Sequence, residues 1–321
     1  MKSFVRKVFI YVLYLTIFTN VSLDAYGAQS IHFTEHPLEN VRGGPSEGLL
    51  DVLKLCGIKT TGSWENIIKM TRSWVVLEQN KKDGIWPVSC HCKDMHAFYN
   101  ALSMLHMTQI VPSCLATYDY AVILGGTLPS IRRRLWFLKQ EWERGVRFRH
   151  LVFLSGERKL YKNQEDEEDF INPSFNPYPI SEDWAYNNQL PKNERDVAEF
   201  VWRQMKLPED WASRISVSFM TIDIKNRKEK VGESLKELLP FWASKISNPG
   251  TVLFVSSQPF IELDSLTICK TLKDYDMRFD IVGPGFSSVV LDHSWTLSAC
   301  CSILAEWIEE ARGKRNCFFS K

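Results

Sequence analysis

Apolar residues cluster in five short runs in the second part of this chain. The runs lie at 120–124, 151–154, 216–222, 251–255 and 279–282, and all but the third are followed at once by Gly or Ser. Between the runs, apolar residues recur every three or four positions, which is the spacing of one helix face. Continuous apolar strands separated by helices are typical of a parallel sheet that is covered on both faces.

This alternation predicts an α/β fold, namely a Rossmann-like five-stranded parallel sheet with helices on both faces and an N-terminal helical region. Right-handed crossovers connect the strands of such a domain. The helices that follow the strands are expected at 130–143, 193–205, 228–246, 262–272 and 294–311.

The connection at 161–192 is unusually long, and it combines an acidic run with Pro, Asn and Tyr residues. Long connections in compact domains are mostly lids, binding loops or disordered segments. The charge and the Pro and Asn content leave little apolar surface for an independent core. We therefore expect a mobile segment over or beside the strand ends, with plain disorder as the alternative.

The start of the chain has the three-part order of a secretory signal sequence. A basic stretch precedes the apolar run Val8–Val21, and the small residues Ala25 and Gly27 follow it. Cleavage after Gly27 is the prediction, which makes residues 1–27 a signal peptide and the protein an exported one, periplasmic or secreted. An uncleaved membrane anchor is the alternative, although the apolar run is short of the roughly 20 residues that a membrane span needs.

Three further segments follow the signal sequence. Residues 28–48 are polar and rich in Gly and Pro, so we interpret them as an extended linker. Residues 49–117 have helical periodicity without a strand pattern, and the α/β domain covers 118–321.

Charge and cysteine content limit the classes of partner. The full chain carries a formal net charge of +1, and loss of residues 1–27 leaves a charge near −1. Nucleic-acid-binding proteins show a strong basic bias, so no nucleic-acid partner is expected. Membrane contact is expected only through the N-terminal segment, if it stays uncleaved. Export permits disulfides among the eight cysteines, but their pairing is left open, and buried thiols are the alternative.

The common catalytic motifs are missing from the sequence. No GxGxxG follows a strand, and no GxxxxGK[ST], HExxH, paired CxxC or GxSxG motif occurs. Cys90-His91-Cys92 could supply metal ligands, but a disulfide or buried cysteines are favoured, so no metal is expected. Asp292-His293 could form an acid–base pair, although a helix cap and a structural histidine are favoured there.

Small and polar residues at the strand ends are the best candidates for a ligand site. In an open parallel sheet, ligands bind beyond the carboxyl ends of the strands. The candidates that follow the strands are Gly125, Gly126, Thr127, Ser155, Gly156, Arg158, Ser256 and Ser257. Arg132, Arg133 and Arg134 are in the first turns of the next helix, where cations oppose the helix dipole and so suggest an anionic partner, and Arg132 is the candidate ligand-binding residue among them. A solvated face paired with the acidic loop is the alternative for the arginines.

Several short segments, taken in order, resemble the DUF218 / YdcF-like family of bacterial proteins. The resembling segments are Tyr118–Gly126, Arg132 with Arg134 and Leu135, Leu151–Arg158, Asn193–Asp196, Val255–Phe260 and Phe279–Gly283. The resemblance implies a Rossmann-like fold with a ligand cleft at the strand ends. It also implies a role in the cell envelope, where some members act, and one member resembles a binder of S-adenosylmethionine.

The resemblance also implies roles for individual residues. Glu194 becomes the candidate catalytic acid or base, and Asn226 joins the ligand-binding residues. Asn226 and Glu229 fit the family's segment after the third strand, but cations stand where the family has threonines. The expected function is the binding of an anionic small molecule, phosphorylated or nucleotide-like, with transferase or hydrolase activity as an extension. An inert binding or scaffold protein is the alternative, and no cofactor is specified.

Overall fold

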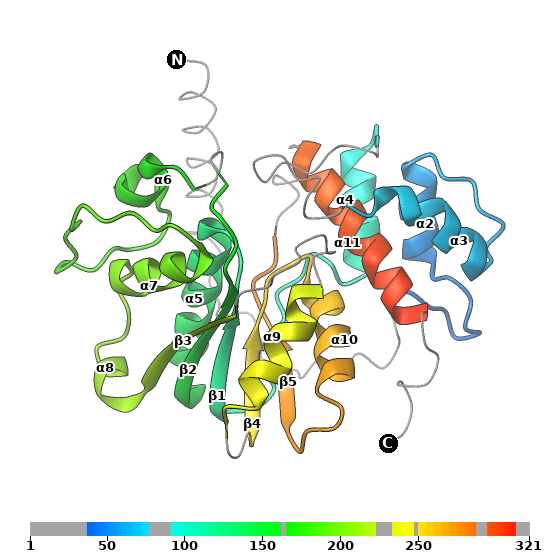
Figure 1. Ribbon diagram of the computed structural model, residues 1–321. Coiled ribbons are helices and arrows are strands. Elements are labelled where there is room, and N and C mark those ends of the chain that lie inside the picture. The colour runs from blue at the N-terminus through cyan, green and yellow to red at the C-terminus, as the bar shows by residue number, and fades with distance from the viewer. Residues whose placement is uncertain are drawn as a thin grey trace.

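The computed structural model describes residues 37–76, 91–161, 165–222, 233–246, 250–286 and 294–312 (Figure 1). The predicted signal peptide, Asn226 and the Asp292-His293 pair lie outside the described residues. Among the described helices, none has both the length and the apolar character that crossing a membrane requires.

The described strands form one parallel sheet. They are β1 (Thr117–Leu124), β2 (Arg147–Gly156), β3 (Ser216–Ile222), β4 (Thr251–Val255) and β5 (Arg278–Val282). Their order is β3-β2-β1-β4-β5, and every neighbouring pair is parallel. The Rossmann-like α/β prediction is therefore confirmed. Strand order reverses at β1, which makes the gap between the ends of β1 and β4 the topological switch point, where such sheets bind ligands.

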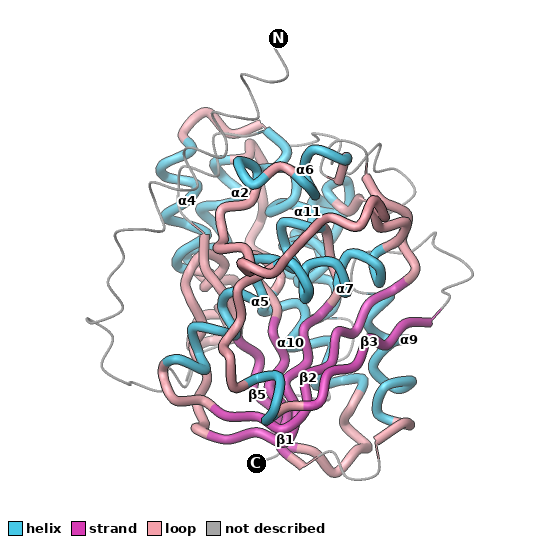
Figure 2. Tube along the Cα trace, turned by 90° about the vertical axis from the view of Figure 1, so that its left-hand side faces the viewer, coloured by secondary structure: helices cyan, strands magenta, loops and turns pink. Residues whose placement is uncertain are grey.

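Helices cover both faces of the sheet, as the apolar strands require (Figures 1 and 2). On one face, α5 (Leu128–Glu143) and α7 (Glu194–Gln204) pack over β1, β2 and β3. The short helix α8 (Trp211–Arg214) adds Trp211 to the same core. On the other face, α9 (Glu233–Ala243) and α10 (Ile261–Thr271) enclose a second core with Trp242 and Phe254.

A separate helical layer lies beside α10 (Figure 1). It contains α2 (Glu47–Leu55), α3 (Trp64–Thr71), the 3-10 turn Arg72–Trp74, and α4 (Met95–Met104). The last helix, α11 (Ser294–Arg312), packs into the same apolar cluster as these N-terminal helices. Both ends of the described chain thus build this layer.

The described end of the expected linker is packed rather than extended. Leu38 is fully buried in the helical layer, and an isolated bridge joins Glu39 to Pro45. Ser46 caps α2, whose first turn already includes Gly48. A single apolar residue in a polar stretch is enough to anchor this segment, which the linker interpretation of 37–48 overlooked.

The long connection is packed between Glu165 and Tyr178. It contains α6 (Glu167–Ile171) and the 3-10 turn Pro173–Phe175, and α6 begins with a capping box between Asp166 and Asp169. Phe170, Phe175 and Tyr178 are buried, and they supply the apolar surface that composition alone does not suggest. The isolated bridge between Ile180 and Met205 keeps this part beside the end of α7. Most side chains in 182–192 are exposed, and the mobility expected of 161–192 stays a prediction.

Candidate functional site

The turn between β1 and α5 is the centre of the candidate site. It consists of Gly125, Gly126 and Thr127, all of them half-buried. A Cβ atom on Gly125 would lie 2.1 Å from Oε1 of Glu194 and 3.0 Å from Cα of Ser155. Glycine is therefore required at this position, because the carboxylate of Glu194 and the backbone of β2 approach the turn closely.

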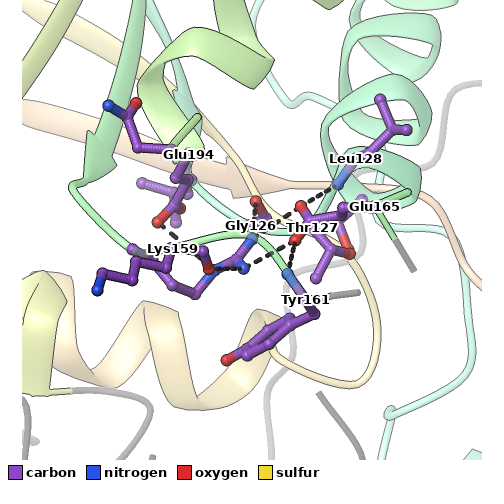
Figure 3. A network of polar contacts seen from close by, with 12 residues as sticks. Gly126, Thr127, Leu128, Lys159, Tyr161, Glu165 and Glu194 are labelled. Atoms are coloured by element: carbon purple, nitrogen blue, oxygen red, sulfur yellow. Dashed lines mark hydrogen bonds and ion pairs between the residues drawn. The ribbon is translucent and has the colours of Figure 1, made fainter. Parts of the chain in front are cut away.

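Glu165 caps the start of α5 from the long connection (Figure 3). Thr127 is the N-cap residue of α5, but its side chain makes no capping hydrogen bond. Instead, Leu128 N donates to Oε1 of Glu165 at 3.0 Å, and Tyr161 N donates to its Oε2 at 2.8 Å. The side chain of Glu165 is fully buried. A buried carboxylate at a helix N-terminus has the surroundings of a bound anion.

Arg158 supplies the positive charge that faces Glu165. Its two terminal nitrogens donate to the two carboxylate oxygens at 2.8 and 2.9 Å, which is the fork geometry that arginine makes with carboxylates and phosphates. One of them also donates to Gly126 O at 3.2 Å, and the guanidinium lies over the ring of Tyr161. Burial alone would lower the pKa of Arg158, but the hydrogen bonds to Glu165 and the charges of Glu194 and Glu165 outweigh it and raise that pKa.

Glu194 lies on the same edge of the sheet as the glycine turn, as expected. It opens α7, and its carboxylate is 3.9 Å from Nε of Arg158. Both side chains are about 11% exposed, so this ion pair is nearly shielded from solvent. Glu194 is thus held beside the arginine rather than placed alone in a polar cleft.

Arg134 joins the ends of β1 and β4 across the switch point. It is buried, and it donates to Leu124 O at 2.7 Å and to Gly125 O. It also donates to Ser257 Oγ at 3.2 Å. Desolvation by burial lowers the pKa of Arg134 to about 10, against the opposing effect of the Asp264 charge.

The hydroxyl of Ser256 already has a hydrogen-bond partner within the protein. Its hydroxyl donates to Asp264 Oδ2 at 2.6 Å. Burial raises the pKa of Asp264 to about 6, although that hydrogen bond and the Arg134 charge act in the other direction. The buried Arg134 thus interacts with the charges of two carboxylates, Asp264 and Glu194.

Arg132 does not belong to the anion site that the sequence suggested. It is 1% exposed and donates to Asp169 O at 3.0 Å and to Gln204 Oε1 at 2.6 Å. It therefore ties α6 to α7, away from the glycine turn. The sequence pointed to the right helix but to the wrong face of it. Arg134, two residues later on α5, is the arginine that reaches the strand ends.

The other expected residues divide into three groups. The structure brings Gly125, Gly126, Thr127, Ser155, Arg158 and Glu194 together, and Arg134 connects Ser257 to them. Gly156 is buried and pairs with Ile222 in the β2–β3 ladder. Asn226 is outside the described residues.

Sequence reasoning missed Glu165 and Asp264, and it named Arg134 without choosing it for the site. The acidic run that contains Glu165 was visible, but nothing in it distinguished this carboxylate from its neighbours. Only the folded chain shows that Glu165 caps α5, because the pair is separated by 37 positions.

No cluster of three or more His, Cys, Asp or Glu residues suited to a metal ion occurs within the described ranges. Comparisons with protein-family models, curated proteins and solved structures give no significant match. The resemblance to the DUF218 / YdcF-like family therefore stays a prediction that rests on the short segments named above.

The raised pKa of Asp264 predicts a specific dependence of stability on pH. Between its unfolded value near 4 and about 6, the folded state binds more protons at this residue than the unfolded state does. Its contribution to stability is therefore present at low pH and is lost as pH rises to about 6. Relative to wild type, Asp264→Asn should gain about 2 kcal/mol in unfolding free energy between pH 4 and pH 7.

Urea unfolding at several pH values measures this difference. The matched control is Asp274→Asn, because Asp274 is exposed. Its unfolding free energy should follow that of wild type across the range. A constant difference between Asp264→Asn and wild type would show that Asp264 titrates as it does in the unfolded chain.

Proposed function

We propose that this chain is an exported, DUF218-like protein that binds a small anionic molecule at the carboxyl edge of its sheet. The observation that carries the proposal is the surroundings of Glu165, where the start of α5, a second backbone N–H group and the Arg158 fork hold an anionic group. Phosphate and carboxylate groups use these same donors. These groups lie beyond the ends of β1 and β2, at the carboxyl edge of the sheet, where such sheets bind ligands.

The surroundings of Glu194 favour binding over acid catalysis. A carboxylate paired with a buried arginine is a poor proton donor, because the pair stabilises its charged form. Its distance of 3.9 Å from Arg158 instead suits a positioning role, in which Glu194 orients the guanidinium. An enzyme, a transferase or hydrolase, remains the second candidate, with Glu194 as a base.

Native mass spectrometry of the purified protein tests the binding proposal. We expect a small bound anion in wild type, the same mass at higher occupancy in Glu194→Gln, and no adduct in Arg158→Met. Removal of the negative charge beside Arg158 should strengthen anion binding roughly three- to tenfold, because two partly buried like charges repel by about 1 kcal/mol. Glu199→Gln is the matched control on the same helix, because Glu199 pairs with the exposed Arg195 and Arg203, and this variant should leave occupancy unchanged.

Other outcomes would revise the proposal. An adduct that persists in Arg158→Met would place the ligand elsewhere, and no adduct in any variant would count against a binding function. A different bound mass in Glu194→Gln would show that Glu194 takes part in turnover, and the enzyme would replace the binding protein.

A further inference from the structure

Glu165 reaches the site from the long connection, outside the strand ends and the helices on the sheet. It lies immediately before Asp166, the N-cap residue of α6. Its carboxylate accepts hydrogen bonds from Leu128 N, Tyr161 N and the Arg158 fork. An external anion could not use these donors while Glu165 occupies them.

We infer that Glu165 is a built-in substitute for the anionic group of the ligand, and that its carboxylate leaves the turn when a phosphate-like group binds there. This inference rests on the proposed function, and it adds a regulatory step to that function. The exchange replaces one anion by another, so Arg158 stays paired throughout. A buried arginine without any anion would be strongly destabilising, which is why the site needs an occupant in both states.

A second observation points to a missing hydrogen-bond partner beside the turn. The hydroxyl of Ser155 is buried and has no hydrogen-bond partner within the described part of the chain. Ser155 lies against the turn, since a Cβ atom on Gly125 would be 3.0 Å from Cβ of Ser155. Buried hydroxyls are usually satisfied, so an unsatisfied one at a candidate site suggests a missing partner. An anion oxygen would accept the hydrogen bond that this hydroxyl can donate.

The packing of α6 allows Glu165 to move without unfolding the rest of its segment. Arg132 holds α6 through the backbone oxygens of Asp169 and Phe170, and Gln204 donates to the same Phe170 oxygen. None of these contacts involves the Glu165 carboxylate. Movement of the Glu165 carboxylate therefore leaves these contacts of α6 intact.

Binding of inorganic phosphate to purified variants, measured by equilibrium dialysis, tests this inference. We expect Glu165→Ala to bind phosphate about 10- to 100-fold more tightly than wild type, because a site that is open only 1–10% of the time loses that factor in apparent affinity. Glu165→Gln keeps the side-chain shape but loses the charge, so it guards against a fold defect in the alanine variant and should also bind more tightly. The matched control is Glu182→Ala in the same connection, whose side chain is 84% exposed and should leave phosphate affinity unchanged.

The outcomes separate this inference from the proposed function. Equal, measurable phosphate affinity in wild type and both Glu165 variants would overturn the inference and leave the anion site standing. Absence of phosphate binding in folded wild type and in both folded variants would overturn the anion site itself. Tighter binding in both variants that disappears on adding Arg158→Met would support the inference and the site together.

Discussion

Replacing Arg158 by methionine should lower the free energy of unfolding by about 3–5 kcal/mol, which is the usual cost of removing one partner from a buried ion pair. The methionine fills most of the volume but leaves the fully buried Glu165 carboxylate without its cation. Glu194 loses the same partner, at 3.9 Å. Two carboxylates that the folded state largely keeps out of water would then lose the cation that they share.

Urea unfolding at neutral pH measures this loss. The matched control is Arg203→Met, because the Arg203 side chain is 67% exposed in its pair with Glu199. An exposed pair contributes less than about 1 kcal/mol, so the control should stay close to wild type. A loss as small in Arg158→Met as in the control would mean that solvent reaches Glu165 and that the site is open.

Oxidation should link Cys56 to Cys301 and raise the unfolding free energy by about 2–5 kcal/mol. The two Sγ atoms are 3.9 Å apart, although the residues are separated by 245 positions. Cys56 follows the end of α2 and Cys301 lies in α11, so the bond would join the N-terminal and C-terminal parts of the helical layer. Closure of so long a loop restricts the unfolded chain strongly, and the proposed export would supply the oxidising conditions that favour the bond.

Peptide mapping after oxidation identifies the bond, and thermal unfolding with and without reductant measures its effect. Cys56→Ser and Cys301→Ser should each remove the dependence on reductant. Cys114→Ser should retain it, because Cys114 is exposed and far along the chain from the pair. Continued alkylation of both Cys56 and Cys301 after oxidation would contradict the prediction.

The sheet was predictable because each strand has an apolar run, which is buried on both faces in β1, β2 and β4. The expected strands at 216–222 and 251–255 have the bounds found for β3 and β4. The expected strand at 151–154 was too short, because β2 begins at Arg147 with alternating exposed and buried residues. Apolar runs thus located the centres of strands, but they did not show where β2 begins, because its first residues include polar ones.

The meeting of Gly125, Ser155 and Glu194 was predictable from topology alone. Parallel strands bring their carboxyl ends to one edge, so sequence distance did not matter. The choice of Arg132 over Arg134 failed because both lie near the start of one helix, and neighbouring elements decide which reaches the strand ends. Arg132 instead meets the backbone of α6, which the sequence did not place against α5.

The packing of the long connection was not predicted, for a related reason. Its composition is polar on average, but Phe170 and Tyr178 are buried individually in the core beneath α5 and α7. Average composition indicates whether a segment can form a core of its own. This segment does not need one, because its aromatic side chains pack into the core of neighbouring elements. The ordered packing is what brings Glu165 to the start of α5.

A crystal structure of Glu165→Ala grown with selenate is the most direct test of the anion site. Selenate has the shape and charge of sulfate, and its anomalous scattering locates it without ambiguity. We predict selenate oxygens within hydrogen-bond distance of Leu128 N and of the Arg158 guanidinium, where the Glu165 carboxylate lies in wild type. A folded variant with Arg158 in place and no selenate at the turn would contradict the account.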